Sequence, residues 1–166
     1  EQMNPELMQV GRVTSVNAAA IEACFLTFPS SVPVIAPIGL GVDSAFNINA
    51  DVAATQIAIA LQAKKLIFLT DQLGILDGDK QLVKKVNARM IGKMIDQGVI
   101  AGGMLTKVRA MMTALASGVK QVRVLNATHA SQLFKALPND ERIGTLLIDT
   151  QAQAHSLVEA LHVRAS

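Results

Sequence analysis

The alternation of apolar runs with helical patterns constrains the fold of this chain more than any other feature of its sequence. Three short runs rich in β-branched and aliphatic residues predict strands at 64–70, 119–126 and 144–149, and KKLIFLT at 64–70 predicts a buried one. Apolar residues at helical spacing predict helices at 88–98, 102–118, 129–137 and 152–163. Strands that alternate with helices form a mainly parallel sheet covered by helices. We therefore expect an α/β three-layer sandwich with a mainly parallel central sheet.

Further elements are expected nearer the N-terminus and after residue 74. Asn17 is positioned to cap a helix at 18–28, and the apolar run at 32–40 predicts a second buried strand. Short strands or hairpins are expected at 9–16 and at 75–86. An Ala-rich helix is expected between Asn49 and Ala63.

The composition is that of one globular domain, which we expect to span 1–166, with 149–166 as an unassigned tail helix. Hydrophobic residues make up 51% and charged residues 17%, which is too apolar for a disordered chain. Aromatic residues make up only 3%, so the core must consist of Ala, Ile, Leu, Val and Met. The single cysteine, Cys24, is expected to be a small buried residue and indicates a reducing, cytoplasmic compartment.

Several classes of partner are not expected. The net charge is +2, with Lys and Arg dispersed along the chain, so we expect no nucleic-acid partner. No apolar run reaches about 18 residues, so we expect no membrane partner. The three histidines have no Cys or carboxylate partners at metal-ligand spacing, so no protein-held metal is expected.

The segment NINAD concentrates polar residues beside an apolar helix pattern. Asn47, Asn49 and Asp51 alternate, and in an extended segment alternate residues point to the same side. They are either helix caps and loop residues or parts of a functional site, and the segment alone does not decide between these interpretations.

The glycine pair Gly102-Gly103 opens the helix predicted at 102–118. Glycines at a helix start let backbone N–H groups approach a phosphate, and Lys107 lies one turn further on. Taken alone, the pair is more often a tight turn than a phosphate site.

Five motifs together resemble the C-terminal half of the acetylglutamate kinase group of the amino acid kinase family. They occur in the order and at the spacing of that group: PVIAPIG at 33–39, NINAD at 47–51, KKLIFLTDQLGILD at 64–77, QGVIAGGMLTKV at 97–108 and RIGTLLI at 142–148. The resemblance implies phosphoryl transfer from ATP, with Mg2+ bridging its phosphates, to the side-chain carboxylate of N-acetyl-L-glutamate in arginine biosynthesis. It also implies a homo-oligomer for the full-length protein.

The resemblance also implies roles for individual residues. Lys107 is similar to the lysine that stabilises the transferring phosphoryl group, Asp51 to the carboxylate that orients the catalytic lysines, and Asn47 to a substrate-binding residue. The nucleotide-binding segments correspond to Asp71, Gln72, Leu73, Gly74, Ile75 and Leu76, and to Val99, Ile100, Ala101, Gly102, Gly103 and Met104.

The chain also departs from the family pattern. The Lys-Gly-Gly loop and the second glycine-rich loop of the N-terminal half have no counterpart here, so the chain alone is expected to be inactive. Ala136 and Arg142 replace a Glu and a Gly of arginine-sensitive members, so arginine feedback is not expected. Two alternatives stay open: the kinase-like regulatory domain of an N-acetylglutamate synthase, and a non-catalytic nucleotide-binding fragment.

Overall fold

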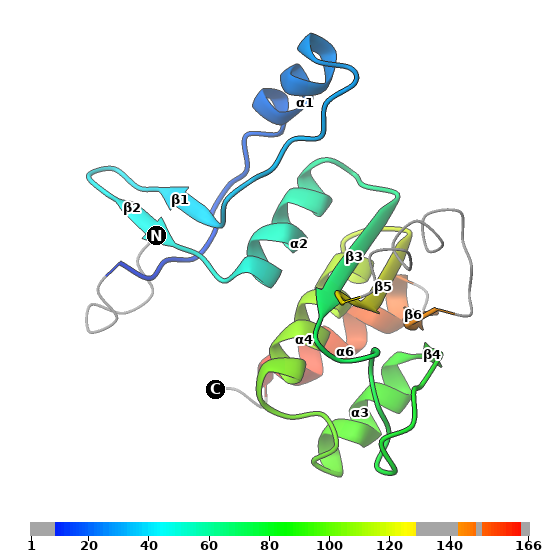
Figure 1. Ribbon diagram of the computed structural model, residues 1–166. Coiled ribbons are helices and arrows are strands. Elements are labelled where there is room, and N and C mark those ends of the chain that lie inside the picture. The colour runs from blue at the N-terminus through cyan, green and yellow to red at the C-terminus, as the bar shows by residue number, and fades with distance from the viewer. Residues whose placement is uncertain (1–8, 129–142, 149–150, 164–166) are drawn as a thin grey trace. The chain divides into compact units, whose positions relative to one another are not determined.

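The computed structural model describes residues 9–128, 143–148 and 151–163 (Figure 1). It forms two compact units, residues 1–63 and residues 64–166, which are described in turn. The helix predicted at 129–137 lies outside the described residues, as do Ala136 and Arg142. No helix in the described ranges is long and apolar enough to cross a membrane.

The first unit has two helices and one small hairpin. Its elements are α1 (Ala18–Thr27), β1 (Ile38–Leu40), β2 (Ala45–Asn47) and α2 (Ala50–Ala60). The expected cap is confirmed, because the Asn17 side chain accepts a hydrogen bond from the Ala20 amide, 3.1 Å away. The expected Ala-rich helix is confirmed as α2.

Three expectations for this unit differ from the structure. The run at 32–40 is not a buried strand, because only Ile38–Leu40 is a strand, which pairs antiparallel with β2 and has an exposed outer face. Cys24 was expected to be buried but is exposed. It lies in α1, and no residue of that helix is buried. The strand expected at 9–16 is reduced to a single bridge between Val10 and Asn47.

The second unit is built on a four-stranded sheet. Its elements are β3 (Lys65–Thr70), β4 (Lys85–Val86), α3 (Ala88–Asp96), α4 (Gly102–Ala116), β5 (Gln121–Asn126), β6 (Thr145–Leu147) and α6 (Gln151–Val163). The strand order is β3-β5-β6-β4; the β3–β5 and β4–β6 pairs are parallel and the β5–β6 pair is antiparallel. The expected α/β class with a mainly parallel sheet is therefore confirmed.

The core of the second unit lies between the sheet and its helices. Helix α4 packs against β5 and α6, and α6 also contacts α3. The buried residues are almost all aliphatic, as the composition predicts, and Phe68 is the one buried aromatic side chain among the described residues. They include Val108, Met111, Met112, Val122, Val124 and Leu125.

Strand β3 is less buried than its sequence predicts. It forms the edge of the described sheet, so only Phe68 is fully buried and Leu69 is about half exposed. The hairpin expected at 75–86 is a tight turn, in which the Asp77 amide donates to the Gln81 carbonyl and Leu76 bridges Leu82. The second half of that hairpin, β4, pairs with β6 instead.

Candidate functional site

The loop after β3 carries the first predicted nucleotide-binding segment. Asp71, Gln72 and Leu73 are exposed, whereas Gly74 and Ile75 are buried and Leu76 is half-buried. The outer half of the loop is therefore open to a ligand, and the inner half is part of the protein interior.

Side chains from two neighbouring strands hold this loop in place. The Asn126 side-chain amide, at the carboxyl end of β5, donates to the Asp71 carbonyl over 3.1 Å. The Thr145 hydroxyl of β6 accepts from the Ile75 amide over 2.8 Å, and Thr145 is fully buried. The loop is thus attached to the sheet at both ends by polar side chains, and its position depends on β5 and β6.

Removing the Thr145 hydroxyl is expected to destabilise this loop. Thr145→Val keeps the shape but leaves the buried Ile75 amide without its acceptor, a loss of about 1–3 kcal/mol in the free energy of unfolding. Urea unfolding followed by far-ultraviolet circular dichroism measures this loss, and hydrogen exchange at Ile75 shows whether it is local. Thr145→Ser is the matched control, because it keeps the hydroxyl. Equal stability of the Val and Ser variants would contradict the anchoring role.

The second predicted segment leads into α4. The amides of Val99 and Ile100 both donate to the Met94 carbonyl, over 2.8 and 3.0 Å, and Ile100 is buried. Ala101 has an extended backbone and gives α4 no side-chain cap. The segment therefore has Ile100 in the core and ends at a helix start whose first amides receive no help from a capping side chain.

The two glycines at this helix start are exposed and surrounded by open space. A Cβ atom added to Gly102 or Gly103 would meet nothing within 4 Å. Gly102 has a φ of +53°, which favours glycine, whereas Gly103 is helical without such strain. Their backbone amides can thus be approached closely by an anion, and the α4 dipole favours negative charge at this point.

Lys107 lies one turn inside α4, against β3. Its ammonium nitrogen is 5.4 Å from the centre of the Phe68 ring, a distance typical of a cation–π contact. Phe68 is buried in β3, two residues before the strand ends at Thr70. This contact holds the Lys107 ammonium near the end of β3 from which the loop at 71–76 begins.

Asn47, Asn49 and Asp51 do not share one face of an extended segment, because β2 ends at Asn47 and α2 begins at Ala50. Asn47 is the last residue of β2. Its backbone amide donates a hydrogen bond to the Gln9 carbonyl, and its carbonyl accepts one from the Gly11 amide. The Asn49 side chain caps α2, accepting from the amides of residues 51 and 52 over 3.0 and 3.2 Å. Asp51 lies in the first turn of α2, half-buried, where the helix dipole favours a carboxylate. The capping interpretation thus applies to Asn49.

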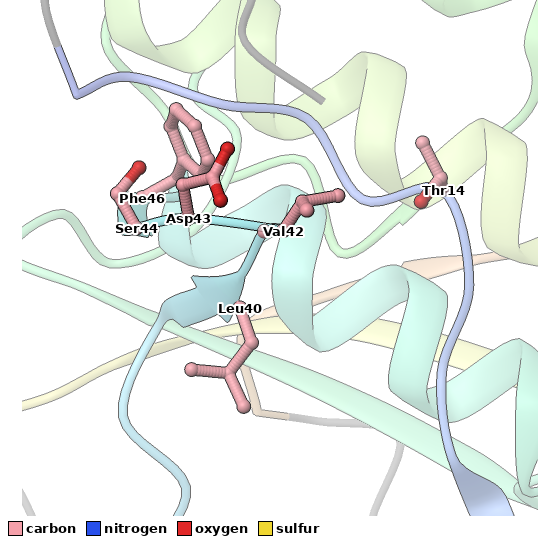
Figure 2. Close-up of a pocket in the computed structure, with 7 residues that line it drawn as sticks. Thr14, Leu40, Val42, Asp43, Ser44 and Phe46 are labelled. Atoms are coloured by element: carbon pink, nitrogen blue, oxygen red, sulfur yellow. The ribbon is translucent and has the colours of Figure 1, made fainter.

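An open hollow of about 640 Å³ lies beside the β1–β2 turn (Figure 2). Figure 2 shows Thr14 on one side of it and Val42, Asp43 and Ser44 of the turn on the other. The turn is closed by the Gly41 amide, which donates to the Ser44 carbonyl over 2.8 Å. No residue predicted for the site lines this hollow, so it is a separate feature of the first unit.

The predicted site residues fall into two groups. Asn47 and Asp51 belong to the first unit; Lys107 and both predicted nucleotide segments belong to the second.

The sequence did not predict three residues that position the second group: Phe68, Asn126 and Thr145. Only Asn126 carried a signal, as a polar residue at the carboxyl end of a predicted strand. Across the part of the chain that is described, no three His, Cys, Asp or Glu side chains gather as metal ligands.

Curated relatives are similar to this chain over most of its length. The acetylglutamate kinase of Pseudothermotoga lettingae is 39% identical over 145 residues, which cover 87% of this chain and 51% of that protein. The chain spans about half the length of the curated relatives it matches.

Solved structures with a similar fold cover most of this chain. The smu.665 protein of Streptococcus mutans has a TM-score of 0.73 at 30% identity, covering 91% of this chain and 55% of that one. An N-acetylglutamate synthase from Neisseria gonorrhoeae has a TM-score of 0.77 at 25% identity, covering 85% and 32%. Residues 1–126 match the Amino acid kinase family, and the chain belongs to that family.

Proposed function

We propose that residues 1–166 form the C-terminal, ATP-binding half of an acetylglutamate kinase, which phosphorylates the side-chain carboxylate of N-acetyl-L-glutamate. The observation that carries this proposal is Lys107, held against Phe68 beside a helix start with open glycines. Support also comes from relatives that are named acetylglutamate kinases and are 36–39% identical.

The second unit offers the groups that phosphate binding needs. The first amides of α4, at Gly102, Gly103 and Met104, are suited to hold nucleotide phosphates, and the Lys107 ammonium offsets charge on the phosphoryl group as it transfers. Mg2+ bound through the nucleotide phosphates would neutralise part of their charge. We propose that the exposed part of the loop, Asp71 to Leu73, contacts the rest of the nucleotide.

The first unit would serve the acceptor. We propose that the exposed Asn47 side chain binds N-acetyl-L-glutamate, since a neutral amide hydrogen-bonds an anion without repelling it. We also propose that Asp51 orients the catalytic lysines, because its carboxylate attracts their positive charge. In the family pattern that this chain resembles, the second of these lysines belongs to the N-terminal half.

Nucleotide binding at the α4 start is tested by Gly103→Ala. The added methyl group meets no protein atom, so the free energy of unfolding should stay within about 1 kcal/mol of the original. A phosphate seated on the Gly103 amide would collide with the methyl group, so the ADP dissociation constant should rise about tenfold or more. Calorimetric titration of the chain with ADP and Mg2+ measures this.

The control for that titration is Gly98→Ala, another exposed glycine with open space around it, at the end of α3. Its added methyl group should leave ADP affinity unchanged. If Gly103→Ala binds ADP as well as the original chain, the phosphates are not held at α4. The chain alone is expected to bind nucleotide weakly and to turn over little N-acetyl-L-glutamate.

A second candidate is the kinase-like domain of an N-acetylglutamate synthase. The observation in its favour is the TM-score of 0.77 to the synthase of N. gonorrhoeae, which was solved with coenzyme A and L-arginine. The two candidates differ in ligand: the kinase half should bind ADP, whereas the regulatory domain should bind L-arginine. Saturable L-arginine binding without ADP binding would favour the synthase.

A further inference from the structure

Almost all of the positively charged residues of the chain belong to the second unit. Residues 64–166 contain 14 of the 15 Lys and Arg residues and eight of the 13 Asp and Glu residues. The formal net charge of this unit is therefore +6, although that of the whole chain is only +2. A unit with such a net charge attracts anions over distances well beyond contact.

The positive charge is concentrated in the stretch that joins the two predicted nucleotide segments. Between Asp79 and Asp96 the sequence has five cationic residues and no acidic one. The stretch begins after the segment 71–76 and ends before the segment 99–104. All five side chains are exposed, and we call them the basic stretch 80–93: Lys80, Lys84, Lys85, Arg89 and Lys93.

Backbone hydrogen bonds attach this stretch to both nucleotide segments. The Val83 amide donates to the Ile75 carbonyl over 2.9 Å, which holds the chain that enters β4 beside the first segment. The Ile100 amide donates to the Met94 carbonyl over 3.0 Å, which holds the second segment against the last turn of α3, where Lys93 lies. The fold therefore sets the position of these cations relative to the two segments.

The strand directions place the beginning of β4 at the edge of the sheet where ligands are expected. Strands β3 and β5 are parallel, β6 runs against β5, and β4 runs with β6. Strand β4 therefore runs opposite to β3, so Lys84, just before β4, lies at the edge where β3 ends and the loop at 71–76 begins (Figure 1). In open α/β sheets, ligands bind outside this carboxyl edge.

We infer that the basic stretch 80–93 is an electrostatic steering surface, which draws the anionic nucleotide toward the segments 71–76 and 99–104. Its side chains raise the rate of encounter without holding the bound ligand, because long-range attraction acts before contacts form. The inference deepens the proposed function and rests on it for the identity of the anion as a nucleotide.

The first measurement needs no nucleotide. Two paramagnetic gadolinium chelates, one anionic and one uncharged, are added to the chain in turn, and the relaxation of amide protons is compared. At Gln72 and Gly103 we expect the anionic chelate to be about threefold more effective than the uncharged one, as a positive surface potential requires. Replacing two cations of the stretch, Lys84→Gln/Lys93→Gln, should remove about half of this excess.

The second measurement follows nucleotide association. NMR line shapes during a titration with ADP give kon and koff. At about 10 mM ionic strength, where the Debye length is about 30 Å, Lys84→Gln/Lys93→Gln should lower kon about threefold. Its koff should stay within about 1.5-fold, because a steering residue does not hold the bound ligand. At about 1 M salt the Debye length is about 3 Å, and the difference in kon should disappear.

The matched control is Lys64→Gln/Lys120→Gln. It removes two exposed cations of the same unit, but these directly precede β3 and β5 and lie at the opposite edge of the sheet. Its kon should stay within about 1.5-fold of the original. All four substituted side chains are exposed, so both double variants should fold like the original chain, which far-ultraviolet circular dichroism checks.

Three results would overturn the inference. An equal loss of kon in both double variants would mean that net charge acts without the basic stretch. A higher koff with unchanged kon in Lys84→Gln/Lys93→Gln would make these lysines ligand contacts. Equal effects of the two chelates at Gln72 and Gly103 would mean that no positive potential exists there. A chain that binds no ADP would instead contradict the proposed function, and the chelates would still decide whether the stretch attracts anions.

Discussion

Replacing Lys107 by Ala is expected to lower kcat for N-acetyl-L-glutamate phosphorylation about a hundredfold or more in the complete protein, the scale of losing one main electrostatic stabiliser. The reason is the position of the ammonium group, 5.4 Å from the Phe68 ring and one turn from the open start of α4. Phosphoryl transfer depends mainly on positioning and charge stabilisation, so a misplaced or missing cation affects the chemical step. Steady-state kinetics with saturating ATP measures kcat.

The matched control is Arg109→Ala, which removes an exposed cation from the same helix. Its kcat should remain within about twofold of the original, because an exposed surface charge contributes little. Lys107→Ala should also weaken ATP binding more than ADP binding, since only ATP carries the phosphoryl group that we propose this lysine stabilises. A loss of kcat below about threefold would remove Lys107 from the mechanism.

Most elements of the second unit were predictable because the partners that bury them lie in the same unit. Helix α4 carries apolar residues at helical spacing, and they pack against β5 and α6. The run at 32–40 has an equally strong strand pattern, but the structure holds only Ile38–Leu40 as a strand. Apolar periodicity predicts what a segment needs to bury, whereas strand formation also requires a neighbouring strand.

The residues that position the site were harder to predict. Thr145 lies inside a predicted strand, and its role arises from a hydrogen bond to Ile75, which is 70 residues away. The sequence around Phe68 predicts only an ordinary core residue. Its contact with Lys107 depends on the position of α4 beside β3. The candidate functional residues were predicted only through a family resemblance, because Gly102-Gly103 alone does not distinguish a phosphate site from a turn.

Replacing Gly74 by Ala is expected to reduce the free energy of unfolding of the second unit by about 3 kcal/mol or more, from backbone strain and overpacking together. Gly74 has a φ of +156°, which side-chain-bearing residues rarely adopt. A Cβ atom there would lie 2.6 Å from the Thr145 hydroxyl and 2.7 Å from a Leu82 methyl carbon. The leucine methyl can move, but rotating Thr145 would break its hydrogen bond to Ile75.

Gly98→Ala separates the two causes of this loss. Gly98 also has a positive φ, +72°, but a Cβ atom added there meets nothing within 4 Å. Its substitution should therefore cost only the backbone strain, about 1–2 kcal/mol. Because the chain has no Trp or Tyr, urea unfolding is followed by far-ultraviolet circular dichroism rather than by fluorescence. Equal losses for the two variants would mean that the loop at 71–76 can move away from β6. The nucleotide segment would then be a mobile loop, not one held by Thr145.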